Sequence, residues 1–352
     1  MKRFARAAVL GVAVVTSLGA LAACGANSSG DDEGDSGKTI ALLLPETKTT
    51  RYEAFDRPLF EAKVKDLCSS CKVDYLNADQ DPQKQQQQAE SALTNGASVL
   101  VLDPVDGTAS AGVVKSAQAS DVPVIAYDRF VKGADYYLSF NNEKVGEMQA
   151  QALVDATGGK GEILMLNGSP TDPNAAQFKA GAHKVLDASG LKIAAEYDNP
   201  DWSPENAQKF TSSQLNNIDP QDLAGVYAAN DGQAGGVIAA LRSAGLKKMP
   251  PITGQDAELA AIQRIVSGDQ FMTIYKSIKT EAEKAAEVAV NIVNDKKVSD
   301  TTDFDGVPSF IFDPAVVTVD KVADTVVADG FYSVKDICTA EYAAACATAG
   351  LS

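Results

Sequence analysis

The chain has 352 residues, 45% of them hydrophobic, and a formal net charge of −16 at pH 7. So acidic a chain argues against nucleic-acid binding and against electrostatic adhesion to anionic lipid. Because the length exceeds what one hydrophobic core usually supports, we expect two domains.

The N-terminal segment has the pattern of a secretory signal. A basic head, MKRFAR, precedes an apolar run that ends in Leu21-Ala22-Ala23-Cys24. This ending is typical of a bacterial lipobox, in which the cysteine after the cleavage site receives lipid. An uncleaved transmembrane anchor is the alternative, but the polar stretch after Cys24 favours a lipoprotein. We therefore predict a signal peptide over 1–23, a lipid on Cys24 and a flexible tether over 24–37, which makes the protein extracytoplasmic.

From residue 38 onward, short apolar runs alternate with amphipathic helical patterns. The predicted strands are 39–44, 72–76, 98–102, 123–127, 136–140, 162–166, 192–197, 224–229, 251–253 and 271–275. A helix is predicted over 81–96, with Asp81 as its N-cap and Pro82 in its first turn. This alternation predicts an α/β fold of two doubly wound parallel-sheet lobes. We assign 38–140 plus 277–307 to an N-terminal lobe and 141–276 plus 308–352 to a C-terminal lobe.

Four cysteines remain if Cys24 carries lipid, and they form two closely spaced pairs. In an exported chain, Cys68 with Cys71 and Cys338 with Cys346 are expected to form disulfides. Cys68-Ser-Ser-Cys71 is also compatible with a redox motif or half a zinc site. However, no other Cys/His cluster completes a metal site, so we predict no metal and no cofactor.

Polar residues follow almost every predicted strand. In open α/β sheets ligands bind beyond the carboxyl ends of the strands, so these residues are expected to line a cleft. Asp and Asn at such positions are often only helix caps or turn formers, and Asp172 and Asp256 are open to that interpretation. Arg129, Trp202 and Lys276 are neither caps nor turn formers. The strand-end residues are Glu46, Arg51, Tyr52, Asp103, Asp106, Asp128, Arg129, Asn167, Asp172, Asn174, Asp198, Asp201, Trp202, Asn230, Asp231, Gln255, Asp256 and Lys276.

A lining of carboxylates, amides and cations with one aromatic plate suits a neutral sugar. Hydroxyl groups both donate and accept hydrogen bonds, and planar side chains can meet two neighbouring hydroxyls. The apolar face of a sugar ring packs on an aromatic ring, and Trp202 is the only Trp. A carbohydrate-active enzyme such as a glycosidase is the alternative of another class. The only His, His183, falls within a helical pattern, which argues against His-based catalysis, and the usual nucleotide and hydrolase motifs are absent.

The chain resembles the bacterial D-xylose-binding proteins and related ribose-type sugar-binding proteins of ABC transporters over roughly 39–332. The segments that carry the resemblance are AYDR (126–129), SFNNEKVGEMQAQALVD (139–155), GSPTDPNA (168–175), WSPENA (202–207), ANDGQAGG (229–236), GQDAELAAIQRI (254–265) and MTIYK (272–276). The resemblance implies two lobes joined by a three-segment hinge, the type I periplasmic binding protein fold, which close on one sugar.

Carried over by position, the resemblance implies a set of ligand-binding residues. The first lobe would supply Arg51, Asp128 and Arg129; the second would supply Asn174, Trp202, Asn230, Asp256 and, at the hinge side, Lys276. Tyr52 stands where the D-xylose-binding pattern has Trp, and its added hydroxyl puts a strict pentose preference in question. Asp231 is expected to act behind the pocket or as a cap.

The expected function is binding of a monosaccharide, D-xylose first, and its delivery to a membrane permease by a monomeric, non-enzymatic lipoprotein. The alternative within this class is a binding protein for other or several monosaccharides, such as glucose, galactose, arabinose or ribose, that also serves sugar sensing.

Overall fold

The computed structural model describes residues 38–351. The predicted signal peptide, Cys24 and the tether lie outside the described residues. Within the described range, no helix is both long and apolar enough to cross a membrane.

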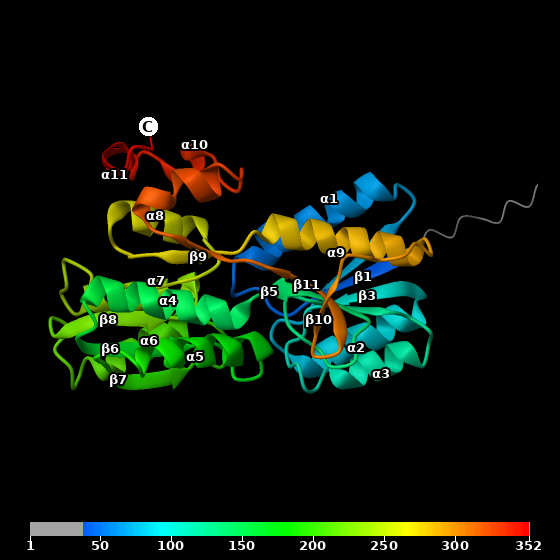
Figure 1. Ribbon diagram of the computed structural model, residues 1–352, viewed down its shortest axis with the longest axis horizontal. Coiled ribbons are helices and arrows are strands. Elements are labelled where there is room, and N and C mark those ends of the chain that lie inside the picture. Colours follow the sequence, from blue (N-terminus) through cyan, green and yellow to red (C-terminus); the bar gives the residue numbers. More distant parts are fainter. Residues whose placement is uncertain (1–37, 352) are drawn as a thin grey trace, which may run out of the picture. The chain divides into compact units, whose positions relative to one another are not determined.

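The first lobe is built around a seven-stranded sheet in the order β10-β11-β5-β4-β3-β1-β2 (Figure 1). All neighbours are parallel except the hairpin of β10 and β11. The strands are β1 (Thr39–Leu44), β2 (Lys72–Asn77), β3 (Ala97–Leu102), β4 (Val124–Tyr127), β5 (Tyr136–Phe140), β10 (Thr302–Phe304) and β11 (Val307–Phe312). The helices are α1 (Arg57–Leu67), α2 (Pro82–Thr94), α3 (Ala111–Gln118) and α9 (Ile278–Val293).

The apolar run of β1 is buried on both faces of this sheet. Ile40, Leu42 and Leu44 pack in one core cluster with residues of α1 and α9. Ala41 and Leu43 point the other way, into a cluster formed with α2 and α3. Because successive strand side chains alternate between faces, a continuous apolar run is what a parallel sheet covered by helices on both sides requires.

The second lobe is built around a smaller parallel sheet in the order β7-β6-β8. Its strands are β6 (Gly161–Asn167), β7 (Leu191–Asp198) and β8 (Leu223–Ala228), and the short strands β9 (Thr273–Tyr275) and β12 (Ala315–Val317) pair antiparallel beside it. The predicted strand 251–253 contributes only an isolated bridge between Val226 and Ile252. The helices are α4 (Asn142–Thr157), α5 (Pro173–Leu186), α6 (Pro204–Gln214), α7 (Asp231–Ser243) and α8 (Leu259–Ser267).

Helices α4 and α5 approach closely enough to require glycine at the contact. A Cβ on Gly146 would lie 2.0 Å from the carbonyl oxygen of Phe178, and one on Gly181 would lie 2.1 Å from that of Glu143. This close approach fixes α5, whose first turns carry Asn174 and Phe178.

The chain passes between the lobes three times, as expected for the type I periplasmic binding protein fold. The crossings follow β5, β9 and β11, and lead respectively to α4, α9 and β12. The sequence placed residues 308–312 in the second lobe, and this boundary is wrong, because Ser309–Phe312 pair with β5 of the first sheet. The two-residue turn Asp305-Gly306, with both φ angles positive, folds β11 back as a hairpin arm of that sheet.

The C-terminal segment, residues 319–351, packs against α8. It contains two short helical turns, η2 (Val319–Lys321) and η3 (Ala323–Val327), followed by α10 (Val334–Ile337) and α11 (Ala343–Thr348). Val326, Ile337 and Cys346 share a buried cluster with Ile262 and Ile265 of α8. A disulfide joins Cys338 to Cys346, and a second one joins Cys68 to Cys71 between α1 and β2, as the sequence predicts.

Candidate functional site

A closed pocket lies between the lobes, beyond the carboxyl ends of the strands. It contains about 280 Å³ of empty space. All of the predicted ligand-binding residues line it, together with four that the prediction did not assign to ligand. The lining residues are Thr49, Arg51, Tyr52, Asp128, Arg129, Asp172, Asn174, Phe178, Trp202, Asn230, Gln255, Asp256 and Lys276.

Asp128 and Arg129 reach the pocket because β4 ends in a tight bend. Asp128 has a φ of +56°, a left-handed conformation that Asp adopts more readily than most residues. Its carbonyl oxygen accepts hydrogen bonds from Ser139 Oγ at 2.6 Å, Tyr137 Oη at 3.3 Å and Asn174 Nδ2 at 3.0 Å. These three donors hold the bend in place, and Asn174 does so from the opposite lobe.

Arg51 is held in a buried cluster of carboxylates. Its Nε and Nη2 donate to Asp56 at 2.9 and 2.7 Å, and Nη2 also donates to Glu281 at 2.8 Å. Its Nη1 lies 3.2 Å from Asp128 Oδ1 without a hydrogen bond. Burial alone would raise the pKa of Asp128, but Arg51, Lys276 and Arg129 together lower it below its usual value. Asp128 is therefore an ionised acceptor at neutral pH.

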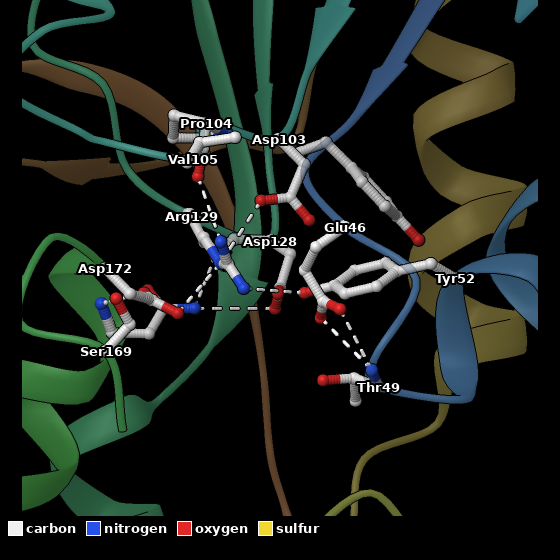
Figure 2. Close-up of polar contacts among 12 residues, drawn as sticks. Glu46, Thr49, Tyr52, Asp103, Pro104, Val105, Asp128, Arg129, Ser169 and Asp172 are labelled. Carbon is white, nitrogen blue, oxygen red and sulfur yellow. Dashed lines mark hydrogen bonds and ion pairs between the residues drawn. The ribbon is translucent and has the colours of Figure 1, made fainter. Parts of the chain in front are cut away.

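Arg129 joins both walls of the pocket (Figure 2). Its Nη1 donates to the carbonyl oxygen of Pro104 and its Nη2 to Tyr52 Oη, both at 3.1 Å. Its Nε lies 2.8 Å from Asp172 Oδ2 of the second lobe, and both side chains are buried. Asp128 and Arg129 follow β4 directly but do not pair with each other. Arg129 pairs with Asp172 and Asp103, whereas Asp128 pairs with Arg51.

Other strand-end carboxylates do not line the pocket. Asp103 is fully buried behind Arg129, 3.5 Å from its Nε, and burial raises the pKa of its carboxyl well above its usual range. Glu46 accepts the backbone N–H of Thr49 and shapes the turn that leads to Arg51. Asp106 accepts the backbone N–H groups of Thr108 and Ala109, both at 2.8 Å. These residues are turn formers and buried supports.

The second-lobe wall is mainly aromatic and amide in character. Trp202, at φ +60°, covers Gly168, where any Cβ would lie 2.0 Å from the indole ring. Phe178 meets the indole edge-on with ring centroids 6.5 Å apart. Asn230 lies at the N-terminus of α7 and Asn174 in the first turn of α5, while Lys276 Nζ lies 3.0 Å from Asp256 Oδ1. Asp231 lies behind this wall and accepts from Thr273, Gln270 and the backbone of Glu258.

Asp172 is both a helix cap and a joint between the lobes. Its Oδ1 accepts the backbone N–H of Asn174 at 2.8 Å, which is the capping role that the sequence allowed. Its Oδ2 accepts from Trp202 Nε1 at 3.2 Å and pairs with Arg129. The interpretation of Asp172 as a cap and nothing more is therefore wrong.

Thr49, Phe178 and Gln255 also line the pocket but were not predicted to bind ligand. Gln255 directly precedes Asp256 at the same strand end, so its position was a usable signal. Phe178 lies one helical turn after Asn174 on α5, and a spacing of four residues places both on one face. Thr49 lies in the turn before Arg51, where nothing distinguishes it in the sequence.

Several buried polar atoms of the pocket-lining residues have no hydrogen-bond partner among the described residues. They include donors as well as acceptors. The atoms are Arg51 Nη1, Arg129 Nε, Asn174 Oδ1, Gln255 Oε1 and Asp256 Oδ1. The arginine atoms and Asp256 Oδ1 take part in ion pairs, whereas the two amide oxygens do not. Unpartnered buried polar atoms are rare in folded proteins and call for an explanation. Within residues 38–351 no group of His, Cys, Asp and Glu is arranged to hold a metal ion.

The lobes touch directly around the pocket. At one rim the backbone N–H of Gly107 donates to the carbonyl oxygen of Thr171 at 3.2 Å, and Thr171 Oγ1 donates to that of Val105 at 3.1 Å. The backbone N–H of Thr50 donates to Glu258 Oε1 at 3.4 Å. Because these contacts join the two lobes across the cleft, the structure shows the closed form.

Comparison with known proteins places this architecture in a family. The family described as "Periplasmic binding protein domain" matches residues 40–297. The chain belongs to the periplasmic binding protein family. It is therefore a binding protein and not an enzyme.

Curated relatives cover most of the chain. The D-xylose-binding periplasmic protein of Escherichia coli is 39% identical over 85% of this chain and 92% of its own length. Its namesake from Haemophilus influenzae is 36% identical over 92% and 98%. The multiple sugar-binding periplasmic receptor ChvE of Rhizobium radiobacter is 32% identical over 74% and 82%.

A solved structure supports the same fold. An ABC transporter solute-binding protein from Clostridium phytofermentans with bound β-D-glucose is 27% identical, with a TM-score of 0.77. The match covers 85% of this chain and 100% of that one.

Proposed function

We propose that this protein binds one monosaccharide, with D-xylose as the first candidate, in the interlobe pocket and delivers it to the permease of an ABC transporter. The observation that carries the proposal is a closed pocket beside an indole ring, in which the amide oxygens of Asn174 and Gln255 have no partner and the cations are held in ion pairs rather than in complete hydrogen bonds. Sugar hydroxyls both donate and accept, so one neutral ligand can satisfy both kinds of atom.

The charge of the pocket favours a neutral ligand over an anion. Arg51 faces three carboxylates, Arg129 faces Asp172 and Asp103, and Lys276 faces Asp256. Each cation is therefore already balanced, and an anionic ligand would have to compete with buried carboxylates. The same balanced groups offer fixed donors and acceptors to hydroxyl groups.

The size of the pocket favours a monosaccharide over a longer saccharide. Its thirteen lining residues come from both lobes and leave only a small space between them. The rim contacts between Gly107 and Thr171 close one side of it.

D-xylose is proposed because two relatives, 39% and 36% identical, are named for it. Tyr52 is the residue most expected to change the preference among sugars, since its hydroxyl accepts a hydrogen bond from Arg129 at the pocket wall. Relatives named for several sugars are 32% identical, so binding of several monosaccharides is the second candidate.

Calorimetry with D-xylose, D-glucose, D-galactose, L-arabinose and D-ribose tests both candidates, with assay of each sugar for turnover. Saturable 1:1 binding of D-xylose, tighter than that of the others and without turnover, is expected. Equal affinity for several sugars would replace the D-xylose proposal by the broader one, and no binding of any sugar would refute both.

The membrane-anchoring part of the proposal depends on the Leu-Ala-Ala-Cys motif at 21–24. A lipid on Cys24 would hold the binding protein near its permease. The wild-type protein is expected to fractionate with membranes, and Cys24→Ser is expected to release it or block its processing. A fully soluble wild-type protein with an unmodified N-terminus would contradict the anchor.

A further inference from the structure

We infer that Glu281 is a positioning residue for sugar binding, acting through Arg51; this inference depends on the proposed function. Glu281 lies in the first turn of α9, directly after the crossing that follows β9 and Lys276. It lines no part of the pocket, and its side chain is fully buried.

The donors of Arg51 show what Glu281 does. An arginine side chain has five N–H groups in a fixed plane. The Nε group and both Nη2 groups are directed to Asp56 and Glu281, which leaves Nη1 as the group without a hydrogen bond. Asp56 holds one edge of the guanidinium through two hydrogen bonds, and Glu281 takes the remaining Nη2 proton and adds a second constraint on its orientation. Nη1 is thereby aimed at Asp128 and the pocket.

The position of Glu281 on α9 links this orientation to the hinge. Because α9 begins where the chain returns to the first lobe, the acceptor of Arg51 lies next to a hinge crossing. Arg51 is thus held in its binding orientation by a helix that starts at the hinge and packs in the first-lobe core.

Replacement of Glu281 separates positioning from simple charge balance. Glu281→Ala removes the acceptor and is expected to weaken D-xylose binding about tenfold, as loss of one hydrogen bond to a charged group does. Glu281→Gln keeps an oxygen acceptor and is expected to restore affinity to within about threefold of wild type. If only the charge matters, Glu281→Gln will bind as weakly as Glu281→Ala, and the inference fails.

A double-mutant cycle tests whether Glu281 acts through Arg51. In an Arg51→Met background Glu281→Ala is expected to change affinity by less than about twofold, because the group that it positions is gone. An undiminished loss in that background would contradict the inference. Glu287→Gln is the matched control, since Glu287 lies on the same helix, pairs with Lys284 and is 46% exposed. If Glu281→Ala does not fold, Glu281→Asp, which withdraws the acceptor by one methylene, takes its place with the same expected loss. Failure of the wild type to bind any sugar would refute the proposed function instead.

A second, independent observation concerns the C-terminal segment, which lies beyond the residues matched by the family. The ring of Phe331 stacks on Phe55 with centroids 4.2 Å apart and planes at 27°, and Tyr332 meets Phe55 edge-on at 5.6 Å. Phe55 belongs to the π-helical segment η1 (Tyr52–Asp56) of the first lobe, whereas Phe331 follows η3 on the second lobe.

The same segment also holds the crossing that follows β9. Asp329 accepts hydrogen bonds from Tyr275 Oη and, at 3.2 Å, from Ser277 Oγ. The ring of Tyr275 lies 5.3 Å from that of Phe331. The segment is therefore fixed to α8, to the hinge and to the first lobe at once, and the stack with Phe55 breaks if the lobes separate there. We propose that residues 319–351 form a latch that stabilises the closed form without touching the sugar.

Removing the stack tests the latch. Phe331→Ala is expected to weaken binding of every sugar by the same factor of about two to ten, which is what one aromatic pair contributes. It is also expected to increase the radius of gyration of the sugar-free protein in X-ray scattering. Phe55→Ala, which changes the first-lobe side of the stack and no residue of the segment or of α8, is expected to do the same.

Phe210→Ala is the matched control, because Phe210 stacks on Tyr197 at 4.8 Å within the second lobe alone. Wild-type affinity in both test variants, or a loss that differs between sugars, would overturn the latch. The scattering measurement needs no sugar, so its result is independent of the proposed function.

Discussion

The two walls of the pocket are built from different chemistry. The first-lobe wall is ionic: Arg51, Asp128 and Arg129 are buried with further carboxylates behind them. The second-lobe wall offers mainly amides and aromatic rings; its charged groups are the Asp256–Lys276 pair at the hinge side and Asp172, which pairs with Arg129. Charged groups give the stronger hydrogen bonds, whereas rings and amides give shape. The comparison predicts that affinity depends mainly on the first lobe and selection between sugars mainly on the second.

Removing Asp128 is expected to have the largest effect. Asp128→Ala removes an ionised acceptor and leaves Arg51 Nη1 without its closest carboxylate in a buried site. A hydrogen bond to a charged group contributes about 1.5–3 kcal/mol, and Arg51 also loses one of its three carboxylate partners. D-xylose affinity should fall about a hundredfold or more in calorimetry. A purely structural role would instead lower the melting temperature and leave affinity within about twofold, which would contradict an ionic first-lobe wall.

The hydrogen bond between Thr50 and Glu258 joins the two lobes. Glu258 should also make the free energy of unfolding depend on pH. Burial, aided by Asp256, raises the pKa of Glu258 from 4.5 to about 7. The folded protein therefore holds a proton that the unfolded chain releases between pH 4.5 and 7. The contribution of this group to stability is greatest below pH 4.5 and is lost as the pH rises to about 7.

The free energy of unfolding that Glu258 contributes is expected to fall by about 3 kcal/mol as the pH rises from below 4.5 to above 7. Glu258→Gln cannot ionise, so its stability relative to wild type should increase between pH 5 and 7.5 in urea unfolding. A constant difference across that range would show that Glu258 titrates normally.

The strand ends were readable from the sequence because a single rule, ligands beyond the carboxyl ends of parallel strands, applies to both sheets. The rule found Asp128 and Trp202 without knowledge of distance. The rule could not predict that the side chain of Asp103, at an equivalent strand end, is buried behind Arg129 and not in the pocket lining. The direction of a side chain depends on the packing of the neighbouring strand. Glu281 was missed for a related reason: it is one of several Glu residues on an amphipathic helix, and only the fold brings it to Arg51.

Trp202 tests the aromatic half of the comparison. Trp202→Ala removes a ring face and the donor to Asp172, and a roughly tenfold to thirtyfold loss of D-xylose affinity is expected, corresponding to about 1.4–2 kcal/mol. Because Trp202 is the only Trp, sugar binding should shift the intrinsic fluorescence of the wild type. Trp202→Phe keeps a ring but cannot donate to Asp172, so it separates stacking from the hydrogen bond. Fluorescence that ignores a sugar seen to bind in calorimetry would exclude the stacking role.

The amide groups of the second lobe should give the smallest losses of affinity and the clearest changes in selectivity. Asn174 is the most informative, because its Nδ2 already donates to the carbonyl of Asp128 while its Oδ1 is unpartnered. Asn174→Asp keeps the acceptor but cannot donate to Asp128, whereas Asn174→Ala loses both. A neutral hydrogen bond contributes about 0.5–1.5 kcal/mol, so Asn174→Ala is expected to weaken D-xylose binding by only about twofold to tenfold.

The ratio of D-xylose to D-glucose affinity should change more in Asn174→Ala than in Arg129→Ala. An amide that meets one hydroxyl discriminates between sugars more than a cation that is already shared among several protein groups. For Arg129 these groups are Asp172, Asp103 and Tyr52. If the Arg129 variant alters selectivity more than the Asn174 variant, the assignment of strength to the first lobe and selection to the second is reversed.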